Sequence, residues 1–188
     1  HLAHMPALVR PDRNTYFMGI ALAVRARADC TGLKVGAIIV RDRRIVSSGY
    51  NGTPEGMTNC SAGGCHRCAN REKYPSGTAY DLCICVHAEQ NALLAAARFG
   101  IAVEGATLYT TVRPCFGCTK EMLQAGIHKV YYLHDWQHPD ADKQQQYEVL
   151  QARFAGGIDR LDMEDPDAKW AGARPSIAAE ITDEHGHR

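Results

Sequence analysis

Residues 83–92 read Cys-Ile-Cys-Val-His-Ala-Glu-Gln-Asn-Ala, and residues 114–118 read Pro-Cys-Phe-Gly-Cys. A catalytic zinc ion takes three protein ligands and keeps a fourth position for water. His87, Cys115 and Cys118 supply three suitable ligands, and two thiolates would offset the charge of the metal. The two stretches together therefore predict a catalytic zinc site.

Glu89 lies in the first stretch but is not needed as a ligand, so it is available to move the proton that the water loses. The chain over 87–99 is rich in Ala and Leu and contains no Gly or Pro, which favours a helix. A second helix is expected over 115–125, directly after a proline. Cys115 and Cys118 would share one face at its N-terminus, where the helix dipole favours thiolate over thiol.

Each half of this motif has a simpler explanation when it is taken alone. Cys-x-x-Cys also occurs in redox-active pairs and in structural zinc half-sites, and His-x-Glu occurs at ordinary helix starts. A redox protein would expose low-pKa thiols, whereas metal-bound thiolates would resist alkylation until a chelator is added. The two halves in this order, both at helix starts, form the signature of zinc deaminases.

Length and composition limit the class of protein. The 188 residues suffice for one domain with a core, and contents of 45% apolar and 22% charged residues are ordinary for a soluble globular protein. The 21 basic and 21 acidic residues cancel, so no stable nucleic-acid complex is expected. We expect neither a membrane span nor a secretory signal, and the clustered cysteine pairs favour metal thiolates in a reducing cytoplasm.

The hydrophobic pattern predicts a mixed sheet covered by helices. Strands are expected over 35–40, 44–50, 106–111, 130–133 and 158–163, and helices over 16–28, 87–99, 115–125 and 143–154. An opening hairpin followed by alternating helices and strands indicates a three-layer α/β (α-β-α) fold with about five strands.

One domain is expected over 16–163. Residues 1–15 are interpreted as a cloning remnant and an N-terminal segment, with Met5 as the natural start. Residues 164–188 are expected to form a C-terminal tail that is loosely ordered or packed on a neighbouring chain.

Residues 51–86 form an insertion that is too long to be structureless inside a compact domain. A second zinc ion in a closed, structural site would fix this insertion, and thiolates suit such a site. The candidate ligands, of which about four would bind the ion, are Cys30, Cys60, Cys65, Cys68, Cys83 and Cys85. Alternatively, some of them are buried free thiols.

The chain resembles the deoxycytidylate (dCMP) deaminase family of the cytidine deaminase superfamily. The matching residues, within 16–162, include His87-Ala88-Glu89, residues 114–118, the Gly-Tyr-Asn-Gly-Thr-Pro run at 49–54 and the cysteine-rich loop. The resemblance implies the cytidine-deaminase-like fold and zinc-dependent hydrolysis of dCMP to dUMP and ammonia. It also implies a structural zinc in the loop, a homo-oligomer, commonly a hexamer, and regulation by dCTP and dTTP.

The same resemblance assigns roles to individual residues. His87, Cys115 and Cys118 carry over as zinc ligands and Glu89 as the proton shuttle. Asn51 carries over as a contact to the small-molecule substrate. A purely conformational role for Asn51, in a turn that needs positive φ, is the alternative.

The phosphate of the substrate is less well supported by the sequence. Many members of the family carry a basic residue where this chain has Gly32, although Lys34, Arg25 or Arg27 could compensate. A substrate without phosphate therefore stays open: a free base, a nucleoside, or a related aminated azine such as guanine or a triazine.

Two further unusual residues are candidate substrate contacts. Arg113 directly precedes the second metal stretch, and a surface salt bridge is its alternative role. Trp136 offers a broad face for stacking, and a core or interface contact is its alternative. Editing of tRNA would need a basic surface that this chain lacks, and a non-catalytic nucleotide-binding scaffold would not need Glu89.

Overall fold

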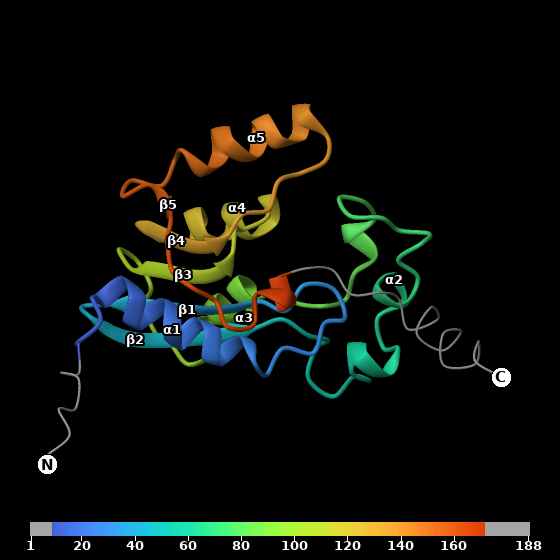
Figure 1. The fold of residues 1–188 in the computed structure, drawn as a ribbon, viewed down its shortest axis with the longest axis horizontal. Helices are drawn as coiled ribbons and strands as arrows, with labels where there is room; N and C mark the ends of the chain where they lie inside the picture. The colour runs from blue at the N-terminus through green and yellow to red at the C-terminus, as the bar shows by residue number, and fades with distance from the viewer. Residues whose placement is uncertain (1–8, 172–188) are drawn as a thin grey trace, which may run out of the picture.

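The computed structural model describes residues 9–171 and contains a five-stranded mixed sheet. Its strands are β1 (Gly36–Arg41), β2 (Arg44–Tyr50), β3 (Thr107–Val112), β4 (Lys129–His134) and β5 (Ile158–Arg160), in the order β2-β1-β3-β4-β5 (Figure 1). β1 pairs antiparallel with β2 and β3, whereas β3, β4 and β5 run parallel. The predicted mixed α/β sheet is confirmed.

Helix α1 (Arg13–Arg25) covers one face of the sheet (Figure 1). Its Phe17 and Ala21 pack with Ile38 of β1 in a buried apolar cluster. A Cβ atom at Gly36 would lie 2.2 Å from the carbonyl oxygen of Ala21, so the helix and strand come too close for any larger residue. The absence of a side chain at this position therefore sets the spacing of α1 from the sheet.

Three helices cover the opposite face: α3 (Ala88–Arg98), α4 (Phe116–Gln124) and α5 (Ala141–Gln151). Ile39 of β1, Ala92 of α3 and Met122 of α4 belong to one fully buried cluster on this side. A Cβ atom at Gly49 of β2 would lie 2.2 Å from the carbonyl oxygen of Ala88. The first turn of α3 therefore lies directly on the sheet, and this contact fixes where the helix starts.

The insertion over 51–86 contains only short helical pieces, which are η1 (Cys60–Ala62), α2 (His66–Ala69) and η2 (Tyr80–Leu82). It projects from one end of the sheet (Figure 1). Gly52 and Val86 pair as an isolated antiparallel bridge, so the two ends of the insertion meet. The insertion is thus a closed loop beside the starts of β1 and α3.

The chain beyond β5 folds back onto its own domain as far as the structure describes it. Arg25 of α1 makes a bidentate ion pair with Asp165 at 2.6 and 2.8 Å, and both side chains are almost fully buried. Asp165 also lies 2.5 Å from Nε2 of His134. The hydrogen bonds from Arg25, together with that from His134, lower the pKa of Asp165 more than burial raises it. They hold this pKa well below its usual range.

The last described element, η3 (Ala168–Ala171), places Trp170 beside α1. The indole ring of Trp170 lies under the cations of Arg25 and Lys34, at 5.3 and 4.7 Å from the ring centroid. The expectation of a loose tail is therefore wrong for 164–171, because a buried ion pair and these cation–π contacts hold the segment. The remainder of the predicted tail and the N-terminal remnant with Met5 lie outside the described residues.

Element boundaries differ from the predictions by a few residues, and capping explains the two helix shifts. Asp12 accepts a hydrogen bond from the backbone N–H of Thr15 at 2.9 Å, so α1 starts earlier than the predicted 16–28. Asp140 likewise accepts from the backbone N–H of Asp142 at 3.0 Å and starts α5 before the predicted 143–154. Among the described residues, no helix is long and apolar enough to cross a bilayer.

Candidate active site

His87, Cys115 and Cys118 come together at the adjacent starts of α3 and α4. Nδ1 of His87 lies 3.4 Å from each of the two Sγ atoms. Ligands of a tetrahedral zinc ion with bonds of about 2.0–2.3 Å lie about 3.6 Å apart, so the three side chains fit such an ion. The structure thus brings the three predicted catalytic ligands into one metal-binding group.

Two helix starts hold these ligands, because two of them occupy capping positions and Cys118 lies in the first turn of α4. His87 is the N-cap of α3 and Cys115 is the N-cap of α4. The Gln90 side chain accepts a hydrogen bond from the backbone N–H of His87 at 2.9 Å and donates to Glu121 of α4 at 3.0 Å. Gln90 therefore links the two helices. A Gln three residues after a helix start is the sequence pattern from which its capping contact could have been predicted.

The electrostatics of the group favour binding of a cation. A hydrogen bond from Cys118, helped by His87, lowers the pKa of Cys115 well below that of a free thiol despite burial. Burial opposes protonation of His87, but its hydrogen bond with Cys115 and the nearby negative charges raise the pKa of His87 to about 9. Negative charge thus concentrates on Sγ of Cys115, and a metal ion can replace the proton on the imidazole.

Glu89 lies in the first turn of α3 and is only 4% exposed. The hydroxyl group of Thr110 in β3 donates a hydrogen bond to Oε1 of Glu89 at 2.9 Å. Burial, together with the charge of Cys115, raises the pKa of Glu89 above that of an exposed carboxyl group. A carboxyl group with a raised pKa holds a proton more readily than an exposed one, which suits a group that must accept a proton and return it. Nothing in the sequence pattern distinguishes Thr110 from an ordinary buried strand residue.

A cavity of about 460 Å³ opens beside this group, and His87, Glu89 and Cys115 line it. That volume is in the range of small-molecule sites. Val112 and Arg113 reach the cavity from the end of β3 and Trp136 from beyond β4, so the cavity lies at the carboxyl ends of parallel strands.

Arg113 is positioned by neighbours on two elements. Its Nε donates to Gln151 of α5 at 2.9 Å, and its Nη1 lies 3.3 Å from Asp135. Its guanidinium also lies over the ring of Tyr132, 5.7 Å from the centroid. The predicted salt-bridge role is present, and the same side chain lines the cavity. Trp136 also lines the cavity, within an aromatic group that includes Tyr147.

Asn51 lines the cavity but holds the backbone of its own chain. Its Oδ1 accepts from the N–H of Val35 at 2.8 Å, and its Nδ2 donates to the carbonyl oxygen of Leu33 at 2.7 Å. These two bonds fix the segment that enters β1. Nδ2 carries a second hydrogen that the bond to Leu33 does not use, and this hydrogen is the group that could reach a ligand.

Arg71 occupies the space that a side chain at position 32 would need. A Cβ atom at Gly32 would lie 2.5 Å from Nη2 of Arg71, and both residues line the cavity. Of the cations expected to compensate for Gly32, Arg25 is committed to Asp165 and Lys34 lies over Trp170. The sequence placed Arg71 in a polar run of the insertion, with no signal that it reaches the cavity.

The six cysteines proposed for a second metal site also gather in one place. Cys60, Cys65 and Cys68 of the insertion are buried and share a cluster with Cys30, which precedes β1. The other two members directly precede α3, and of these Cys83 is partly buried and Cys85 is buried. All six side chains are free thiols. The cluster forms one wall of the cavity, which several of its members line.

Known proteins share both the sequence and the fold. The family model for the cytidine and deoxycytidylate deaminase zinc-binding region matches residues 11–134. A deoxycytidylate deaminase of Saccharomyces cerevisiae is 41% identical over 132 residues, a match that covers 70% of this chain and 41% of the yeast protein. The deoxycytidylate deaminase of Mycobacterium phage D29 is 44% identical over 131 residues, covering 65% of this chain and 95% of the phage protein.

Among solved structures, the dCMP deaminase of cyanophage S-TIM5 in complex with dCMP and dUMP matches with a TM-score of 0.61 and 30% identity. The match covers 81% of this chain and 99% of the phage chain. The chain spans less than half the length of the yeast relatives, at 41% and 38% of those proteins. The family model, the phage enzyme and the solved structure all match this chain. The chain therefore belongs to the cytidine and deoxycytidylate deaminase zinc-binding family.

Proposed function

We propose that the protein, through a deaminase domain over 16–163, hydrolyses the amino group of dCMP to give dUMP and ammonia. The observation that carries this proposal is the convergence of three metal ligands and one buried carboxyl group, Glu89, on a cavity of nucleotide size. A redox pair or a structural zinc site would not require that carboxyl group. Relatives named as deoxycytidylate deaminases, and one solved with dCMP and dUMP, support the choice of substrate.

His87, Cys115 and Cys118 would hold the catalytic zinc ion, which when bound supplies the Lewis acidity that makes a water molecule acidic near neutral pH. Glu89 takes one proton of the attacking water to the ring nitrogen and then carries the second proton of that water to the departing amino group, which leaves as ammonia. The raised pKa of Glu89 suits both halves of this transfer. Thr110 fixes one carboxyl oxygen, which leaves the other oxygen available for the proton transfer.

Arg71 is our candidate for the contact to the phosphate of the substrate. A guanidinium group binds phosphate through two parallel hydrogen bonds, and Arg71 reaches the cavity next to Gly32. It thereby supplies a cation at the position where many relatives carry a basic side chain. Arg113 and Trp136, at the ends of parallel strands, are candidates for contacts to the base or the sugar.

The substitution Glu89→Gln tests this proposal. We expect the variant to keep its fold and its zinc and to lose activity by on the order of 10²–10⁴-fold, because the amide cannot shuttle a proton. Ammonia release from dCMP, deoxycytidine, cytosine, guanine and an aminotriazine, with zinc content measured in parallel, checks both reaction and substrate. Glu148→Gln on the exposed side of α5 is the control. Undiminished turnover by zinc-loaded Glu89→Gln, or a preference for a substrate without phosphate, would contradict the proposal.

We also propose that metal in the cysteine cluster fixes the insertion. The buried free thiols, drawn from three separate segments, support this, and four thiolates suit a structural zinc ion. Cys83 and Cys85 directly precede His87, so metal held there would also place the start of α3.

Finally, we propose that the protein is a homo-oligomer in a reducing compartment such as the cytoplasm. Free thiols support a reducing environment. Leu94 and Phe99, on and just after α3, are 59% and 72% exposed and could be covered by a second subunit. Light scattering coupled to size exclusion measures the mass, and a monomer at all concentrations would contradict this proposal.

A further inference from the structure

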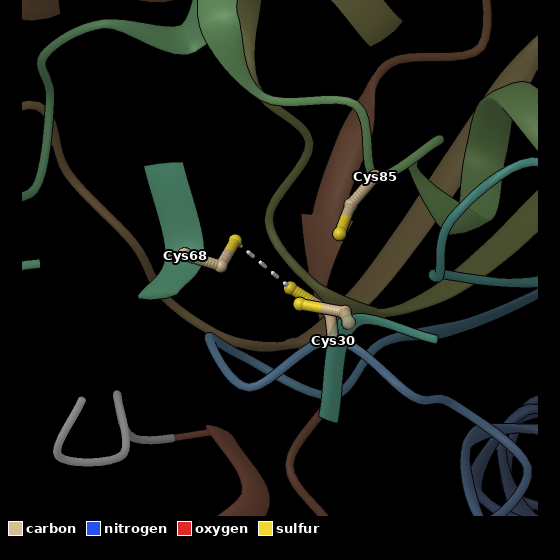
Figure 2. A group of neighbouring side chains, drawn as sticks. Cys30, Cys68 and Cys85 are labelled. Carbon is tan, nitrogen blue, oxygen red and sulfur yellow. Dashed lines mark hydrogen bonds between the residues drawn. The ribbon is translucent and has the colours of Figure 1, made fainter. Parts of the chain in front are cut away.

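The six cysteines divide into two overlapping groups of four. One group consists of Cys30, Cys60, Cys68 and Cys85, and the other of Cys65, Cys68, Cys83 and Cys85. Within each group all four Sγ atoms lie within 4.8 Å of one another. Two residues, Cys68 and Cys85, belong to both groups. Figure 2 shows Cys68 and Cys85 pointing into one space together with Cys30.

The sulfur–sulfur distances match those of zinc tetrathiolate sites. Zn–S bonds of about 2.3 Å in a tetrahedron set neighbouring sulfur atoms about 3.8 Å apart. The Sγ atoms of Cys30 and Cys68 lie 3.8 Å apart in the first group. In the second group, Sγ of Cys83 lies 3.8 Å from the Sγ atoms of both Cys65 and Cys68. Both groups therefore have edges of tetrahedral length.

A single ion would use only part of this cluster. Four ligands close a structural zinc site, so an ion in the first group leaves Cys65 and Cys83 without metal. An ion in the second group leaves Cys30 and Cys60. In the first case the sulfur of Cys83 would still lie 3.8 Å from Cys68, which is already a ligand. A second ion at that position would complete a second tetrahedron with Cys65, Cys68, Cys83 and Cys85, whose Sγ atoms lie within 4.8 Å of one another.

Backbone groups are arranged to carry the negative charge of the thiolates. The N–H of Gly32 points to Sγ of Cys30, and the N–H of Thr31 points to Sγ of Cys60, each at 3.4 Å. A Cβ atom at Gly32 would lie 2.5 Å from Nη2 of Arg71 and 3.3 Å from Sγ of Cys30, so the guanidinium also lies near this sulfur. Such donors stabilise thiolates over thiols and orient metal ligands.

Iron–sulfur clusters fit the arrangement less well. Each iron in such a cluster also binds inorganic sulfide, which separates the cysteine sulfurs of different irons. Here the four sulfurs of each group lie within 4.8 Å, which leaves room for a single metal ion at each centre. Zinc has no geometric preference beyond four-coordination and accepts all-thiolate sites.

We propose that this cluster is a binuclear zinc site in which Cys68 and Cys85 bridge two ions. Cys30 and Cys60 complete the first site, and Cys65 and Cys83 complete the second. Two Zn²⁺ ions replace the six thiol protons, so the site carries a net charge of −2. This inference rests on the metal-bound insertion proposed above and changes the number of ions and the role of the shared ligands.

The two ions would join three segments that lie far apart in the sequence. The first ion ties Cys30 before β1 to Cys60 and Cys68 and, through Cys85, to the segment before α3. The second ion ties Cys65 and Cys68 to Cys83 and Cys85 of that same segment. The bridging cysteines make the two ions interdependent. Loss of a bridging ligand is therefore expected to release both ions, whereas loss of a terminal ligand such as Cys60 releases one.

Metal counting on the full chain tests the binuclear site. We expect three zinc ions per chain by elemental analysis and native mass spectrometry, and two in Cys115→Ala, which loses the catalytic ion. Cys68→Ala is expected to keep one ion and Cys60→Ala two. Met57→Ala, an exposed residue of the same insertion, is the matched control and should keep three.

X-ray absorption at the zinc edge tests for paired zinc ions directly and can be measured on the wild-type protein. Bridging thiolates hold the two ions close enough for zinc–zinc scattering, which we expect in the wild-type protein and in Cys115→Ala. Two ions per wild-type chain without zinc–zinc scattering would overturn the binuclear site and leave the single structural ion of the proposed function intact. One ion per chain after incubation with excess zinc and desalting would overturn both.

Discussion

The proposed catalytic ligands and the cysteine cluster lie side by side but are held in place by different forces. His87 and Cys115 cap helices whose first turns rest on a buried sheet. The cysteine cluster lies in an insertion whose helical pieces are single turns. A hydrophobic core therefore positions the catalytic group before any metal binds, whereas the insertion depends on its thiols and on what they bind.

Removal of all metal should produce the largest difference between the two regions. Without ions, the insertion over 51–86 is expected to open, because its short elements bury little apolar surface besides cysteines. Strand β3 should stay protected because its side chains are almost all buried. Hydrogen exchange followed by mass spectrometry before and after chelation measures both regions. Equal loss of protection in both regions, or no loss in either region, would contradict the proposed difference between them.

Arg71→Ala tests whether the insertion also contributes to substrate binding. Loss of a charged hydrogen bond of about 1.5–3 kcal/mol should raise KM for dCMP by about 10–100-fold. Turnover of deoxycytidine should change little, because that substrate has no phosphate. The exposed Lys73→Ala in the same insertion is the control. An equal loss with both substrates would instead indicate a structural role for Arg71.

Gly49→Ala tests the region that is held by the sheet. The new Cβ atom would lie 2.2 Å from the carbonyl oxygen of Ala88 and 2.4 Å from the backbone nitrogen of Ala92. We expect a lower free energy of unfolding by about 1–3 kcal/mol, together with reduced activity as α3 shifts. Denaturant unfolding measures the first effect. Gly19→Ala on α1, where the added Cβ atom meets no neighbour within 4 Å, should not lower stability.

The predictability of each region from sequence follows from the same physical difference. Strand periodicity and the helix-start motif specified the sheet and the meeting of His87 with Cys115 and Cys118, because both depend on local patterns. The position of Arg71 could not be predicted, because it depends on how an irregular insertion folds over Gly32. The overlap of the two groups of four cysteines could not be predicted either, since spacing alone allows many sets of four.

The C-terminal segment was mispredicted for a related reason. Residues 164–171 are polar and show no periodicity, which indicated a loose tail. Their position depends on the ion pair between Asp165 and Arg25, which are distant in sequence, and on the cation–π contacts of Trp170. A lone arginine in a helix and a lone aspartate beyond the last strand carry no sign that they will meet.

Thr110→Val tests how far the hydrogen bond from β3 sets the pKa of Glu89, and among these substitutions it should have the smallest effect on activity. The hydroxyl of Thr110 stabilises the Glu89 carboxylate and so opposes the rise in pKa that burial causes. Its removal should raise the pKa of Glu89 further and cost about 1 kcal/mol, or several-fold in kcat. Because Glu89 must be ionised to accept the proton of water, the acidic limb of the kcat–pH profile should move to higher pH. Thr111→Val, equally buried in β3 but bonded to the N–H of Gly36, should lower stability without moving that limb. An unmoved limb in Thr110→Val would mean that burial alone sets the pKa of Glu89.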